Sequence, residues 1–131
     1  MKTRIEDSVE KFHSGFNCAQ AVTCTYCDIA SINCDSAFEV TRKYGGGRHK
    51  LCGAVIGMYI IASAANGKEI YEDPKRWLNN DDALLKKLAD EFIKKRGTLI
   101  CSELPKIENG MRMCKEYVRD AAEILEKNIN F

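Results

Sequence analysis

The chain has 131 residues, enough for one domain with a hydrophobic core and too few for two of ordinary size. Twenty Lys and Arg residues against nineteen Asp and Glu residues leave a formal charge of +1, which argues against a nucleic-acid-binding protein and against binding to an anionic membrane. Residues 1–7 alternate charges and lack the apolar core of a signal peptide, so we expect a single domain, residues 1–131, in the cytoplasm.

The cysteine content is the most informative part of the composition. Seven cysteines are an odd number, and in a reducing compartment they argue against a framework of structural disulfides. They favour free thiols, a metal site or redox chemistry. The cysteines are Cys18, Cys24, Cys27, Cys34, Cys52, Cys101 and Cys114.

Two helices are predicted at the start of the chain. From Ile5 onward, apolar side chains recur every three or four residues, which predicts an amphipathic helix that ends near Ser14. Asn17 is a good N-cap, so we expect a second helix over residues 18–30 with Cys18 in its first turn.

The middle of the chain predicts a short helix and then a central one. Ser36 and Glu39 have the spacing of a capping box, which predicts a helix over residues 37–43. Residues 51–65 carry no charge and predict the helix around which the others pack. A bilayer needs about 20 apolar residues, so this run is too short to cross a membrane and is expected to be buried in protein.

Glycines surround and enter this central segment. Gly53 and Gly57 are four residues apart and share one face of a helix, where a neighbouring backbone or a flat ligand can approach closely. Tight helix packing is the interpretation we favour. In the alternative, a cofactor lies between a flexible glycine joint, residues 45–47, and the groove along the face that carries Gly53 and Gly57. The contacting residues are then Gly45, Gly46, Gly47, Gly53 and Gly57.

The following segments alternate between loops and a clear helix. Residues 66–80 predict a long loop anchored by Trp77. The next helix is expected to begin near Asp82 and to end at Gly97 as its C-cap. Residues 98–105 predict a short helical turn or an extended piece.

The last predicted helix begins near Cys114. Asn109 and Gly110 form a turn signal before it, and apolar residues then recur at helical spacing, with Cys114 on the inward face. Together these segments predict an all-α domain, a bundle of about six helices around the central helix at about 51–65.

Four of the cysteines are placed near helix starts or stops. Cys18 and Cys52 fall in predicted first turns, Cys114 lies in or just before one, and Cys101 follows a helix stop. The N-terminus of a helix favours a thiolate over a thiol and makes the sulfur a better nucleophile or metal ligand. Three basic residues precede Cys52 and are expected to strengthen this effect there: Arg48, His49 and Lys50.

The other three cysteines are interpreted as packing residues. A cysteine commonly behaves as a small buried hydrophobe. Cys24 and Cys27 have the spacing of a redox motif, but they lie in a predicted helix without a preceding strand, so a thioredoxin-like site is disfavoured. We therefore interpret Cys24, Cys27 and Cys34 as part of the core.

Several separated blocks of this sequence resemble one known family. They are residues 15–22, 44–47, 52–57 and 97–104, followed by Cys114. In this order they are similar to the proteins named for the cysteine pattern C-GCAxxG-C-C, a family proposed to be redox-active. The resemblance spans almost the whole chain. It implies that the functional set is Cys18, Cys52, Cys101 and Cys114.

The same resemblance implies a helical domain related to one found beside haem in split-Soret cytochromes. This chain, however, has no Cys-x-x-Cys-His sequence. Covalent haem attachment is therefore disfavoured.

Three hypotheses remain open. In the first, the thiolate of Cys52 or Cys18 is oxidised and a second cysteine of the four resolves it, with a redox partner protein or a small thiol as the exchange partner. In the second, Cys18, Cys52, Cys101 and Cys114 together bind zinc or an iron–sulfur cluster. No pair of the four forms a Cys-x-x-Cys knuckle, which disfavours zinc more than a cluster.

The third hypothesis is a non-enzymatic helical interaction module whose cysteines only pack. The sequence leaves open the substrate, the electron donor or acceptor, and whether the chain forms a homodimer.

Overall fold

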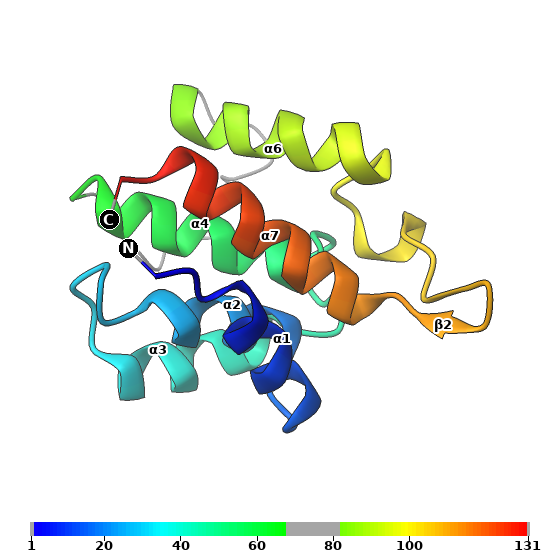
Figure 1. The fold of residues 1–131 in the computed structure, drawn as a ribbon, viewed down its shortest axis with the longest axis horizontal. Coiled ribbons are helices and arrows are strands. Elements are labelled where there is room, and N and C mark those ends of the chain that lie inside the picture. Colours follow the sequence, from blue (N-terminus) through cyan, green and yellow to red (C-terminus); the bar gives the residue numbers. More distant parts are fainter. Residues whose placement is uncertain (1, 68–81, 131) are drawn as a thin grey trace.

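The computed structural model describes residues 2–67 and 82–130, and this part of the chain is mostly helical (Figure 1). The prediction of an all-α bundle with about six helices is confirmed, with one small hairpin in addition. The α-helices are α1 Ile5–His13, α2 Cys18–Tyr26, α3 Cys34–Thr41, α4 Gly53–Ala65, α6 Ala83–Arg96 and α7 Cys114–Asn128. The shorter elements are the 3₁₀ helices η1 Arg42–Tyr44 and η2 Cys101–Glu103 and the strands β1 Ile107–Glu108 and β2 Met111–Arg112. Most of the predicted loop at residues 66–80, including Trp77, lies outside the described residues.

Helix α4 is the centre of the bundle, as predicted. All its side chains from Gly53 to Ser63 are buried. In Figure 1, α6 lies above α4 and α7, and α1, α2 and α3 lie below them. The helix begins at Gly53 rather than at Leu51, because Leu51 instead forms a β-bridge with Ile100.

Close packing of α2 on α4 explains two of the glycines. A Cβ atom at Gly57 would lie 2.9 Å from the Cβ of Val22 and 3.0 Å from the carbonyl oxygen of Ala19. A Cβ at Gly53 would lie 3.1 Å from the backbone nitrogen of Ala19. Helix α2 therefore packs closely on this face of α4, which supports the interpretation as tight helix packing. That a cofactor contacts Gly53 and Gly57 stays a prediction.

Replacing Gly57 with alanine is expected to lower the free energy of unfolding by about 1–2 kcal/mol. Overpacking costs about 1–3 kcal/mol, and the better helix propensity of alanine offsets up to about 1 kcal/mol of it. Chemical denaturation measures the change. Ala65→Val enlarges an exposed position of the same helix and should change stability by less than about 0.5 kcal/mol. Equal stability of Gly57→Ala and the unchanged chain would contradict the packing argument.

The start of α2 is capped as predicted. The side chain of Asn17 accepts a hydrogen bond from the backbone nitrogen of Gln20 at 2.8 Å, and the side chain of Gln20 accepts one from the backbone nitrogen of Asn17 at 3.0 Å. This reciprocal capping box satisfies two donors at the helix start. Cys18 is consequently the first residue of α2.

The end of α2 and the start of α3 differ from the prediction. Helix α2 ends at Tyr26 rather than near residue 30, since the chain turns through Ser31, whose φ is +62°. Helix α3 starts at Cys34 because the side chain of Asn33 accepts from the backbone nitrogen of Ser36 at 2.9 Å. The capping box predicted at Ser36 is therefore wrong.

The C-terminal half follows the predicted caps. The side chain of Asp82 accepts from the first turn of α6, and Gly97 ends this helix with a φ of +90°. Asn109 and Gly110 have φ of +52° and +76° and join β1 to β2. Positive φ at both positions is typical of a tight hairpin turn, and the strands it joins are too short to show a sequence pattern.

Within residues 2–67 and 82–130, none of the helices combines the length and the apolar character needed to cross a bilayer.

Candidate thiol site

The starts of α2 and α7 bring two distant cysteines together. Cys18 is the first residue of α2 and Cys114 is the first residue of α7. Their thiols interact closely enough to shift each other's pKa, and both residues are half-buried. A contact between two sulfurs nearly a hundred residues apart depends on the packing of α2 against α7.

Two further cysteines are placed by a short strand-like pairing. The backbone nitrogen of Cys52 donates to the carbonyl oxygen of Leu99 at 2.8 Å, and that of Cys101 donates to the carbonyl oxygen of Lys50 at 2.7 Å. Both Cys52 and Cys101 are near enough to Cys18 for their charges to raise its pKa. The structure therefore brings all four of the predicted thiols into one region.

The glycine joint borders this region. Gly46 and Gly47 adopt φ of +69° and +73°, which favours glycine. A Cβ at Gly47 would lie 3.0 Å from the Sγ of Cys101, and one at Gly45 would lie 2.6 Å from the Cγ of Asn17. The joint thus folds tightly against Cys101 and the cap of α2. That it binds a cofactor stays a prediction.

The thiolate is favoured at Cys114. The hydrogen bond from the Cys18 thiol and the positive charge of Lys106 lower the pKa of Cys114 to about 6, although partial burial acts against this. The same hydrogen bond and burial raise the pKa of Cys18. These opposite shifts favour the thiolate at Cys114 and the thiol at Cys18.

Cys52 is a buried thiol rather than an activated one. It is the N-cap of α4, and the backbone N–H groups of Ala54 and Val55 lower its pKa, but burial outweighs them and raises the pKa to about 11. Only 2% of the residue is exposed. The expectation that Cys52 or Cys18 carries the thiolate stays a prediction, and it is disfavoured at Cys52, where desolvation outweighs the helix N-terminus.

Lys106 is the cation of the site, and sequence reasoning missed it. Its Nζ donates to the Sγ of Cys101 at 3.2 Å and to the carbonyl oxygen of Leu104 at 3.3 Å. It also donates to the carbonyl oxygen of Cys101. The expected cations Arg48 and Lys50 are exposed, and His49 packs edge-on against Tyr44. The only sequence signal for Lys106 is its position five residues after Cys101.

Replacing Lys106 with methionine is expected to raise the pKa of Cys114, because a positive charge that stabilises the thiolate is removed. The pH dependence of thiol alkylation at Cys114 measures this pKa. Lys106→Arg retains the charge and should leave the midpoint close to that of the unchanged chain. Coinciding midpoints for the methionine variant and the unchanged chain would show that Lys106 does not act on this thiol.

In the part of the chain that the structure describes, no group of three or more His, Cys, Asp or Glu side chains is arranged so that it could hold a metal ion. A zinc or iron–sulfur site at Cys18, Cys52, Cys101 and Cys114 thus stays a prediction.

The chain matches the model of a known protein family. A family model described as "Putative redox-active protein (C_GCAxxG_C_C)" matches residues 16–128. The chain belongs to this family. Comparison with curated proteins and with solved structures gave no match. The matched residues of this C_GCAxxG_C_C family member include the four thiols of the site and its glycine joint.

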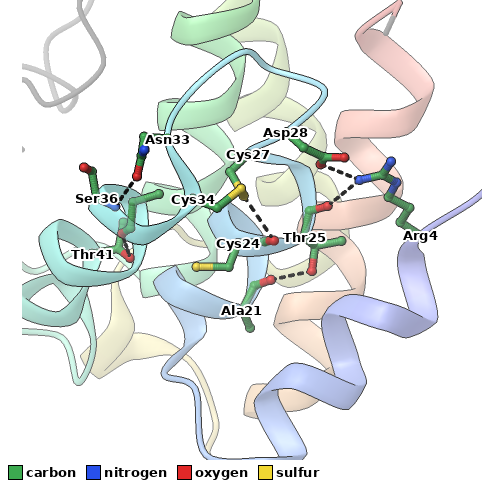
Figure 2. Close-up of a disulfide and its surroundings, with 11 residues drawn as sticks. Arg4, Ala21, Cys24, Thr25, Cys27, Asp28, Asn33, Cys34, Ser36 and Thr41 are labelled. Atoms are coloured by element: carbon green, nitrogen blue, oxygen red, sulfur yellow. Dashed lines mark hydrogen bonds and ion pairs between the residues drawn. A yellow bond between two sulfur atoms is a disulfide. The ribbon is translucent and has the colours of Figure 1, made fainter.

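The remaining cysteines of this family member do not all behave as predicted. Cys27 and Cys34 form a disulfide with a Cα–Cα distance of 5.4 Å, which joins the end of α2 to the start of α3 (Figure 2). Their interpretation as simple packing residues is therefore wrong. The turn at Ser31 reverses the chain and brings the two residues together, and nothing in the spacing of seven residues indicates this in advance. Cys24 has a free thiol and is half-buried.

Proposed function

We propose that this chain is a thiol redox protein in which Cys114 is the attacking thiolate and Cys18 is the resolving thiol. The observation that supports this most directly is the close interaction of the two thiols at the starts of α2 and α7, with the pKa of Cys114 lowered to about 6. A thiolate that is ionised at neutral pH and touches a second thiol has what dithiol exchange requires.

The reaction is a two-electron exchange with a disulfide of a partner protein or of a small thiol compound. The Cys114 thiolate attacks one sulfur of that disulfide, forms a mixed disulfide and expels the other sulfur as a thiolate. Cys18 then transfers its proton to the leaving thiolate and attacks the Sγ of Cys114, which expels the second sulfur. The second sulfur leaves as a thiolate and takes a proton from solvent, so the products are a Cys18–Cys114 disulfide and two thiols of the substrate.

Cys52 and Cys101 belong to the proposed site as neighbouring thiols. Charge on either would raise the pKa of Cys18, so an uncharged, buried Cys52 makes it easier for Cys18 to ionise during the second step. The Lys106 ammonium hydrogen-bonds Cys101 and also attracts the thiolate of Cys114. We place this chemistry in the cytoplasm, where a pool of small thiols can reduce the site again.

The test is disulfide mapping after oxidation with a small disulfide compound. Trypsin releases residues 113–115 but leaves residues 12–42, with four cysteines, in one peptide, so further cleavage after Tyr26 and fragment-ion sequencing are needed to show that the expected bond of Cys114 is to Cys18. Cys18→Ser should instead accumulate a mixed disulfide at Cys114, whereas Cys24→Ser should behave like the unchanged chain.

Two outcomes would overturn the proposal. One is oxidised protein in which Cys18 and Cys114 remain free. The other is iron or zinc bound at one site per chain in protein purified without oxygen, with loss of the metal in Cys114→Ser, which would favour the metal hypothesis.

A further inference from the structure

A third thiol lies next to the disulfide, at the opposite end of α2 from Cys18. Cys27 directly follows α2 and is bonded to Cys34, the first residue of α3. Cys24 precedes Cys27 by three residues, and Figure 2 shows its side chain on the same side of α2 as the disulfide. The Sγ of Cys27 lies 3.4 Å from the carbonyl oxygen of Cys24. Two oxidised sulfurs and one free thiol therefore share the junction of α2 and α3.

The two sulfurs of the disulfide differ in their access to solvent. Cys27 is 1% exposed, whereas Cys34 is an exposed residue. A thiol from solvent can reach Cys34, but attack there would expel the thiolate of buried Cys27, which is costly. Attack at Cys27 would expel a solvated Cys34 thiolate, but burial shields Cys27 from solvent. A thiol of the same chain beside Cys27 avoids both difficulties.

Cys24 is placed for that attack. Side chains three residues apart on a helix have Cβ atoms about 5–6 Å apart, and a disulfide needs about 3.5–4.5 Å. Cys27 lies outside α2, in the turn of residues 27–31, so its backbone can rotate to shorten this distance without disturbing the helix before it.

We propose that Cys24, Cys27 and Cys34 form a second thiol–disulfide exchange site, in which the disulfide moves from Cys27–Cys34 to Cys24–Cys27. The Cys24 thiolate attacks the Sγ of Cys27, a new S–S bond forms, and the old bond breaks with its electron pair on Cys34. The Cys34 thiolate then takes the proton that Cys24 gave up to solvent. One disulfide and one thiol are present before and after the step, so no oxidant or reductant is consumed.

The exchange changes what holds α3 in place. After the step, α3 loses its covalent bond to α2. Its C-terminal half remains bound to the start of α2. The side chain of Asn17 donates to the carbonyl oxygen of Thr41 at 3.3 Å, and the side chain of Gln20 donates to the carbonyl oxygen of Phe38 at 3.0 Å. The released Cys34 is an exposed thiol at the opposite end of α3, where thiol-specific electrophiles can reach it.

Disulfide mapping of the folded full chain tests the exchange. The protein is equilibrated at pH 8 without reductant, quenched with acid, and labelled at its free thiols with N-ethylmaleimide. Trypsin leaves residues 12–42 in one peptide, so cleavage after Tyr26 by chymotrypsin and before Asp28 by an Asp-specific protease is needed to separate the three cysteines. We expect a fraction of chains with label on Cys34 and a Cys24–Cys27 bond.

Variants make the result specific. Cys24→Ser should lose the label on Cys34, and Cys18→Ser, which removes a thiol at the other end of α2, should keep it. Cys34→Ser in a glutathione redox buffer should form the Cys24–Cys27 bond. The proposal is overturned if the unchanged chain never carries label on Cys34, if Cys24→Ser carries as much, or if Cys24 and Cys27 stay free or glutathionylated in Cys34→Ser.

Discussion

Cys114→Ser is expected to abolish the fast phase of alkylation by iodoacetamide at pH 6. With a pKa of about 6, half of Cys114 is thiolate at this pH. An ordinary cysteine with a pKa of about 8.5 is then less than about 1% ionised. The weaker base is intrinsically about tenfold less nucleophilic. We therefore expect Cys114 to react about tenfold faster than an ordinary exposed cysteine at pH 6.

The sign of the pH dependence follows from the lowered pKa. As the pH falls through about 6, Cys114 takes up a proton and its alkylation slows. As the pH rises to about 8.5, other thiols ionise and the advantage of Cys114 disappears. Cys24→Ser is the matched control and should keep the fast phase. A fast phase that survives Cys114→Ser, or that moves to Cys52, would contradict the assignment of the thiolate.

Removal of the disulfide in the double variant Cys27→Ala, Cys34→Ala is expected to lower the free energy of unfolding by about 2–3 kcal/mol. The closed loop is short, with a sequence separation of seven residues, and the chain-entropy estimate for such a loop is about 2.5 kcal/mol. The double variant leaves no disulfide partner for Cys24, so exchange within the chain cannot mask the loss. Denaturant unfolding without reductant measures the change.

The matched control for this loss is the unchanged chain in a phosphine reductant. Reduction should lower its stability to near that of the double variant, whose own stability should not respond to the reductant. If the double variant and the oxidised chain unfold at the same denaturant concentration, the disulfide contributes nothing to holding α3 against α2.

The helices that were predicted well are those with complete local signals. Helix α7 begins at Cys114 and α6 ends at Gly97, as caps and periodicity indicated. The prediction failed at the end of α2 and the start of α3. There the chain reverses at Ser31 and closes a disulfide, and a strong helix pattern through residue 30 gave no warning of either.

The sequence by itself determined the central apolar helix, the caps of α2 and α6 and the family, since these depend on neighbouring residues and on motifs that can be read along the chain. Only the tertiary structure decided that Cys18 meets Cys114, that Lys106 replaces Arg48 and Lys50 as the cation of the site, and that Cys52 is a buried thiol. The physical reason is that a thiol ionises according to its burial, its hydrogen bonds and the charges around it. Those are properties of residues brought together by folding, not of residues adjacent in sequence.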